Sequence, residues 1–417
     1  MKKIKKTDKS IHDIRQNFWI LASIQSGSIG LWGLILGWQL SKSYPPEIVM
    51  GSVCIGNIFL WLIGIGVISM SSKNRTNSIE NINKVLGKPS AIVSALFLIL
   101  AFLSWYVFQL KVATSSINSI FQLDSITHNT FSIRTGAAIG LVGALLAIGG
   151  LKVIKWIAVI CLPILIIYQL VALIISENNV IILKNFGISF SAIILIIIYL
   201  LPGTINLPTF FRHSRSLADS YFALTLMAFF YTFFQFSSIW LNIDNSSFLI
   251  FSNFVDLKLL FKIFICSFVV LVTISNITVN IYFASASWEA LVPKFVGSKE
   301  YAIIGLVGAA AYTFIQITYP MQVLINLANY YIANLGIILI LTFLLDIILK
   351  KQSKIIIRRI GNATWLISCI AATILEINKN KESYIILSST GLSILFFISA
   401  IFIEESIWSL KKIITKK

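Results

Sequence analysis

The feature that most constrains this chain is a series of twelve apolar runs, each about as long as a bilayer-spanning helix and almost free of charge at its centre. A helix needs about 20 predominantly apolar residues to cross the hydrocarbon core. Lipid also excludes exposed irregular backbone, so each run is expected to be a helix. The runs lie at residues 17–40, 48–70, 91–110, 133–150, 156–176, 186–205, 220–241, 259–283, 301–318, 321–349, 360–375 and 384–403. The sequence therefore predicts an all-α polytopic membrane protein with twelve transmembrane helices, and transport is the first function to consider.

Charge is sparse and unevenly placed along the chain. Hydrophobic residues make up 57% of it and charged residues 12%, about half the charge of a typical soluble domain. The net charge of +17 could indicate nucleic-acid binding, but 25 of the 33 lysines and arginines fall in the two tails and in alternate loops. This asymmetry follows the positive-inside rule. We expect an integral protein of a bacterial inner membrane, embedded in the lipid bilayer, with both termini cytoplasmic and no nucleic-acid partner.

Two of the predicted helices contain residues that interrupt helical structure. The first has four glycines between residues 27 and 37, and the sixth has a Pro202-Gly203 pair near its end. Proline removes a backbone donor and glycine loosens a helix. In transporters built from two inverted five-helix repeats, broken helices at corresponding positions surround the substrate. The glycines of the first helix could equally serve close helix packing.

Ionisable groups are nearly absent from the predicted spans. The 16 acidic residues lie in tails, loops or span ends, and Asp346 lies near the inner end of the tenth helix. Proton relays in transporters normally use mid-membrane carboxylates, whereas backbone carbonyls and hydroxyls at unwound helices can hold sodium. The charge pattern therefore favours sodium over protons as the coupling ion. The three histidines and four cysteines form no metal-ligand or catalytic spacing, so we expect neither an enzyme nor another cofactor.

Three short motifs occur in order along the chain. The third predicted helix places Trp105 and Gln109 four residues apart, on one helix face. The eighth contains Ser275-Asn276-Ile277-Thr278-Val279-Asn280, with two asparagines four residues apart, and the second contains Gly56-Asn57. These motifs are similar to the Trp-x-x-x-Gln element, the Thr-Asn-x-x-x-Asn segment and the second span of the nucleobase–cation symporter family, the cytosine, purine and hydantoin permeases.

The resemblance implies a five-plus-five inverted-repeat core followed by two C-terminal helices. The implied divisions are a basic cytoplasmic tail at 1–16, a first repeat at 17–176, a second repeat at 186–349, helices 11 and 12 at 360–404 and a cytoplasmic tail at 405–417. It also implies a substrate site at mid-membrane. The implied substrate-binding residues are Gln25, Trp105, Gln109, Tyr199 and Asn280, with the two aromatic rings sandwiching the substrate.

The residue chemistry agrees with a neutral heteroaromatic substrate. Such a molecule has two π faces, and stacking on an aromatic side chain contributes about 1–3 kcal/mol per base. Glutamine and asparagine can satisfy its amide-like edge without a buried charge. An anionic substrate would call for an arginine or lysine, and none lies deep in a predicted span.

For the coupling ion, the resemblance implies the backbone carbonyls of Leu21, Ile24 and Leu271 and the hydroxyl of Ser275. The chain departs from the family pattern here, because Ile274 occupies the position of a second adjacent hydroxyl and only Thr273 could compensate. It departs again after the sixth helix, where Pro208-Thr209-Phe210-Phe211 replaces an Asp-aromatic-x-Arg motif. Both departures indicate a divergent subgroup.

The sequence thus predicts a secondary transporter that imports a nucleobase or related neutral heterocycle by alternating access, coupled to sodium. Two alternatives stay open. One is an amino-acid or other small-solute carrier on the same fold. The other is a membrane sensor or scaffold that keeps the fold without flux, which the departures at Ile274 and Pro208 motivate.

Overall fold

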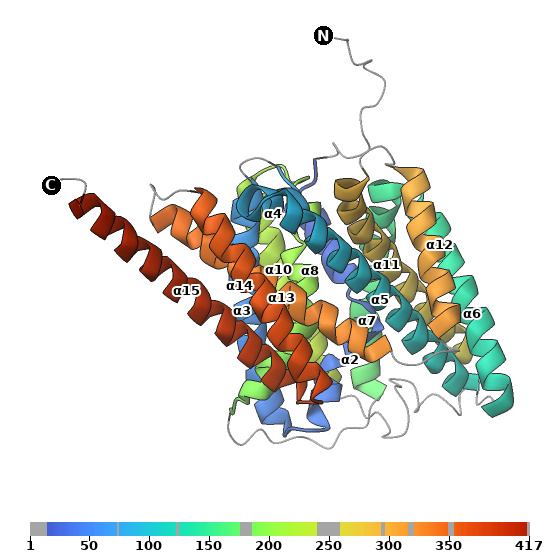
Figure 1. Cartoon of the computed structure of the whole chain (residues 1–417). Helices are drawn as coiled ribbons and strands as arrows, with labels where there is room; N and C mark the ends of the chain where they lie inside the picture. Colours follow the sequence, from blue (N-terminus) through green and yellow to red (C-terminus); the bar gives the residue numbers. More distant parts are fainter. Residues whose placement is uncertain are drawn as a thin grey trace, which may run out of the picture.

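The computed structural model describes residues 15–72, 75–121, 125–175, 186–239, 259–292, 297–315, 321–348 and 354–414. Within these ranges the chain is almost entirely helical (Figure 1), with one isolated β-bridge between Gln16 and Ser214. The helices are α1 (Phe18–Gly27), α2 (Gly30–Ser41), α3 (Pro46–Ser72), α4 (Ser78–Leu86), α5 (Lys88–Phe121), α6 (Ser125–Ala147), α7 (Gly150–Ile175), α8 (Phe190–Ile205), α9 (Pro208–Phe211), α10 (Leu217–Ile239), α11 (Leu259–Leu291), α12 (Ser298–Ile315), α13 (Met321–Ile348), α14 (Lys354–Ile377) and α15 (Glu382–Ile414).

Nine helical segments in the described ranges are long and apolar enough to cross a membrane. They correspond to α3, α5, α6, α7, α8 with α9, α10, α11, α14 and α15. The first predicted span is divided between α1 and α2, and the predicted spans at 301–318 and 321–349 coincide with α12 and α13. The all-helical prediction is confirmed, since each apolar run of the sequence forms mainly helix where the structure describes it.

The predicted interruption of the first span is confirmed, and the second interruption lies just after the Pro202-Gly203 pair, between Ile205 and Pro208. The helix stops at Gly27 and resumes at Gly30. In contrast, α8 continues through Pro202 and Gly203 as far as Ile205. It ends at Ile205, the last residue of the predicted span, because Pro208 supplies no N–H to the preceding turn and begins α9, where that N–H is not needed.

The broken first helix lies inside the bundle. Here α1 packs on α7 and α10, and α2 packs on α10, α11 and α5. The long helices α5 and α11 run against each other, α6 pairs with α12, and α3 pairs with α8. Figure 1 shows α14 and α15 on one side of the bundle next to α13, and α6 and α12 on the opposite side. Helices far apart in sequence therefore surround the break.

One end of the bundle carries α4, a short helix in a segment that the sequence predicts as a loop. Asn77 begins it with a reciprocal capping box to Glu80, and the Ser78 hydroxyl donates to the Ile205 carbonyl at 3.2 Å. At the same end, the Gln16 N–H donates to the His213 carbonyl at 2.8 Å. We call this region the α4 end. At this end, the start of the described chain is hydrogen-bonded to the turn between α9 and α10.

Candidate functional site

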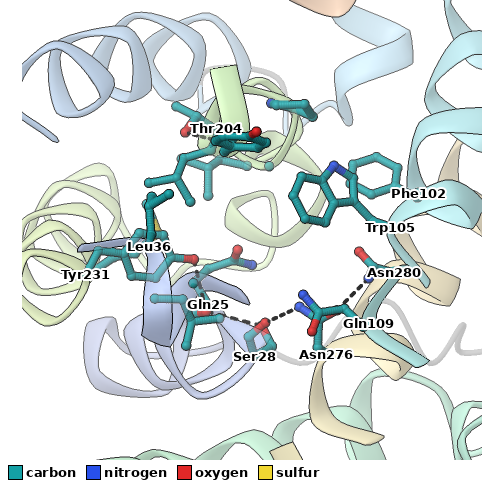
Figure 2. Close-up of a pocket in the computed structure, with 18 residues that line it drawn as sticks. Gln25, Ser28, Leu36, Phe102, Trp105, Gln109, Thr204, Tyr231, Asn276 and Asn280 are labelled. Carbon is teal, nitrogen blue, oxygen red and sulfur yellow. Dashed lines mark hydrogen bonds between the residues drawn. The ribbon is translucent and has the colours of Figure 1, made fainter. Parts of the chain in front are cut away.

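A cavity lies beside the break between α1 and α2 and is walled by α5, α8, α10 and α11. About 90 Å³ of it is open to the centre of a water-sized sphere, whereas one buried water needs about 10–15 Å³ on that measure. The cavity therefore has room for a small organic molecule. None of its lining side chains carries a formal charge. Figure 2 shows side chains from these helices facing a common space.

All five residues that the sequence proposes as substrate-binding line this one cavity: Gln25, Trp105, Gln109, Tyr199 and Asn280. They come from α1, α5, α8 and α11, and their positions in the chain span more than 250 residues. The structure therefore brings together every predicted substrate residue. Their roles in binding stay a prediction.

The aromatic wall differs from a sandwich. The rings of Trp105 and Tyr199 meet edge to face, with centroids 6.3 Å apart and planes at 80°. A ring stacked between two parallel rings needs about 7 Å between them, from two contacts of about 3.5 Å. In this arrangement a planar molecule can stack on Trp105, and Tyr199 must rotate before it can cover the second face.

Amide side chains from α5 and α11 occupy the wall beside the break (Figure 2). The Gln109 Oε1 accepts from the Leu31 N–H at 3.2 Å. The Asn276 Nδ2 donates to the Ser28 carbonyl at 2.6 Å, and the Asn280 Nδ2 donates to the Asn276 Oδ1 at 2.7 Å. These bonds hold the amides in place, so the cavity has a preorganised polar edge.

On the opposite wall, Gln25 and Tyr231 lie together, from α1 and α10 (Figure 2). The Tyr231 hydroxyl donates to the Gln25 backbone carbonyl at 3.2 Å. The Gln25 Nε2 is buried and has no hydrogen-bond partner. A buried unpaired amide costs about 1–3 kcal/mol, so this donor is suited to a ligand or a water molecule in the cavity.

The positive φ of Gly30 determines how closely the break approaches the amides. Its φ is 75°, which L-residues with a side chain rarely adopt. A Cβ on Gly30 would lie 2.7 Å from the Gln109 Nε2 and 2.8 Å from the Asn276 Nδ2. Only glycine allows the α2 start and these two side chains to share this space.

The four residues proposed for the coupling ion lie on α1 and α11. On each helix they precede the cavity amides in the chain. Leu21, Ile24 and Ser275 are buried and Leu271 is half-buried. The Ser275 hydroxyl donates to the Gly27 carbonyl at 2.8 Å. The Ile24 carbonyl accepts from the Ser28 hydroxyl at 2.6 Å. In the described chain, no group of three or more His, Cys, Asp or Glu side chains could hold a metal ion.

Solved transporter structures resemble this chain closely in fold. One is Mhp1, a nucleobase-cation-symport-1 family transporter in a closed conformation with bromovinylhydantoin bound, with a TM-score of 0.70, 16% identity, and coverage of 94% of this chain and 95% of that one. Another is a Na⁺-coupled sialic acid symporter, with a TM-score of 0.69, 12% identity, and coverage of 94% and 91%. A third is the Eremococcus coleocola manganese transporter, with a TM-score of 0.59, 12% identity, and coverage of 99% and 98%.

The chain has the fold of these transporters. It is the five-plus-five inverted-repeat fold with two further C-terminal helices that the sequence predicts. No protein-family profile matches the sequence, and no curated protein matches it either. At identities of 12–16% the likeness establishes the architecture. The substrate has to be argued from the cavity itself.

Several cavity residues were not among the predicted site residues. Tyr231 and Met227 come from α10, Thr204 from α8 and Ser28 from the break. Asn276 did have a signal in the sequence, because it precedes Asn280 by one helical turn and therefore shares its face. Nothing in the local sequence of α10 distinguishes Tyr231 from the other aromatic residues around it.

Proposed function

We propose that this protein is a secondary transporter that carries a small neutral heterocycle of the nucleobase or hydantoin type across the membrane by alternating access. The observation that carries the proposal is the convergence of the Trp105 indole with the amides of Gln25, Gln109 and Asn280 on one uncharged cavity. This cavity lies at the helix break, where transporters of this architecture bind their substrates.

The donors and acceptors of the cavity favour a molecule with an amide-like edge. The Gln25 Nε2 can donate because nothing in the protein accepts from it. The Asn280 Nδ2 is bonded to Asn276, which leaves the Asn280 Oδ1 to accept. A lactam edge presents one carbonyl and one N–H side by side, and amides can satisfy both. A charged substrate would lose its hydration without gaining a counter-charge, at a cost of several kcal/mol.

The orientation in the membrane is argued from the charge pattern of the sequence. The α4 end carries the loops rich in lysine and arginine, so we place it in the cytoplasm of a bacterial cell, with both termini on that side. Uptake into the cell is the transport direction that the family resemblance implies. Coupling to sodium through Leu21, Ile24, Leu271 and Ser275 stays a prediction of the sequence, and the geometry of those residues is argued below.

The test begins with a thermal-shift screen of purified protein against pyrimidines, purines, hydantoins and amino acids. Uptake of the best ligand is then measured in cells with wild type, Trp105→Ala and Asn280→Ala. Loss of a stacking contact worth about 1–3 kcal/mol lowers affinity about 5- to 150-fold. Trp156→Ala is the matched control, because that indole is 59% exposed on the outer face of α7.

The proposal predicts that both cavity variants lose uptake and that Trp156→Ala keeps it. Unchanged uptake in Trp105→Ala and Asn280→Ala would show that the cavity is not the substrate site. Protection by amino acids alone, with no response to any base, would favour the small-solute carrier instead. Ligand binding without uptake or counterflow in proteoliposomes would favour a sensor.

A further inference from the structure

We infer that hydrogen-bond donors of the chain itself hold the break in the first membrane helix, in the place where the resembling family uses a sodium ion. The pocket then binds its substrate without sodium. The second statement rests on the proposed function, whereas the first concerns only the helix break. The argument uses the five backbone carbonyls from Ile24 to Ser28.

A broken helix leaves carbonyls without their usual N–H partners, and in a membrane these groups must find other donors. A bound cation at an unwound segment is one way to satisfy them. Sodium coupling of that kind requires carbonyl oxygens that face a common point. The state of these carbonyls therefore indicates whether the break itself needs an ion.

The break satisfies its first carbonyls locally. The Ser28 hydroxyl donates to the Ile24 carbonyl at 2.6 Å and lies 3.2 Å from the Gln25 carbonyl. The Gln25 carbonyl also accepts from the Tyr231 hydroxyl of α10 at 3.2 Å. The Ser26 carbonyl accepts from the Ile29 N–H at 3.4 Å. The Ser28 and Tyr231 hydroxyls and the Ile29 N–H thus satisfy the carbonyls at the end of α1.

Helix α11 satisfies the remaining two. The Ser275 hydroxyl donates to the Gly27 carbonyl at 2.8 Å, and the Asn276 Nδ2 donates to the Ser28 carbonyl at 2.6 Å. On the far side of the break, the Leu31 N–H donates to the Gln109 Oε1 at 3.2 Å. Every carbonyl from Ile24 to Ser28 therefore has a protein donor. We call this set of bonds the break clamp.

On α11, one of the two adjacent hydroxyls expected of a sodium site is missing, and the one hydroxyl that could compensate is already hydrogen-bonded. Ile274 presents hydrocarbon in the position next to Ser275, and the Thr273 hydroxyl donates to the Val269 carbonyl of its own helix at 2.7 Å.

Hydrogen–deuterium exchange of the peptide that covers residues 24–31 tests the clamp without any substrate. Wild-type protein is compared in sodium chloride and in choline chloride at equal ionic strength, and the expected exchange rates are the same. Ser275→Ala removes the donor to Gly27 and is expected to speed exchange about fivefold in both salts, for a bond worth about 1 kcal/mol.

Thr273→Val is the matched control, since its hydroxyl bonds within α11 and a sodium site would need it. We expect this variant to exchange like wild type. A saturable, sodium-specific slowing of exchange in wild type would overturn the proposal. So would a Ser275→Ala effect that appears only in sodium, or a Thr273→Val effect of the same kind. Size-exclusion profiles and unfolding midpoints establish that each variant is folded.

The ligand screen separates this proposal from the proposed function. Binding of a base with equal affinity in sodium and in choline supports both. Binding only in sodium refutes the clamp and leaves the transporter proposal standing. If no base binds in either salt, the proposed substrate fails, and the exchange experiment still decides whether the clamp holds the break.

Discussion

Replacing Gly30 by alanine tests whether the conformation of the break organises the cavity. A non-glycine residue at the φ of 75° costs about 1–2 kcal/mol. The new Cβ would also lie 2.7 Å from the Gln109 Nε2 and 2.8 Å from the Asn276 Nδ2. Both amides must move, and each loses a bond to the break, at about 1 kcal/mol apiece. The expected total is about 3–4 kcal/mol of stability.

Gly203→Ala is the matched control because Gly203 lines the same cavity and a Cβ there meets nothing within 4 Å. The free energy of unfolding and the ligand-induced thermal shift are measured for both variants. Gly30→Ala is expected to lose stability and the ligand response together, while Gly203→Ala keeps its stability. If the two variants were equally stable and responded equally to ligand, the argument from the break geometry would be refuted.

Two further predictions concern residues outside the cavity. Burial, followed by the negative charge of Glu289, raises the pKa of Glu300 at the α4 end to about 8. The protonated Glu300 side chain therefore contributes its full stabilisation below about pH 4.5, and this stabilisation is lost as the pH rises through about 8. Unfolding midpoints should fall over that pH range in wild type. An equal fall of the unfolding midpoint in a Glu300→Gln variant would contradict this. Tyr106 is fully buried and donates to the Gly140 carbonyl at 2.9 Å. Tyr106→Phe should therefore unfold about 1 kcal/mol more easily, and equal stability would show that this bond adds nothing.

The helices could be predicted from the sequence because lipid leaves a long apolar run few alternatives. The same reasoning could not find α4, since Ser78–Leu86 has apolar residues on one helix face and polar residues on the other, and mean hydropathy alone does not recognise such a helix. The second interruption lies close to its predicted position, but the proline and glycine that suggested it do not form it. The helix passes through Pro202 and Gly203 and ends at Ile205.

The predicted cavity residues share a property that the sequence displays directly, namely a polar or aromatic residue in an apolar span. Trp105 and Gln109 are one helical turn apart, and Asn280 follows Asn276 by the same spacing. The bonds of the break clamp could not be predicted from the sequence in this way. Ser275 and Gly27 are 248 positions apart, and the bond between them depends on how α11 packs beside the break.

Some polar residues both line the cavity and bond to the helix break, and this affects how cavity variants must be interpreted. Gln109 and Asn276 both bond to the break, so their loss disturbs the backbone as well as the cavity edge. Gln25 and Trp105 differ, because the Gln25 Nε2 has no protein partner and the Trp105 indole is half-buried against the cavity. A change at either side chain leaves every bond of the clamp in place. Variants of these two residues therefore report on substrate contact, whereas variants of Gln109 and Asn276 report on contact and on the break together.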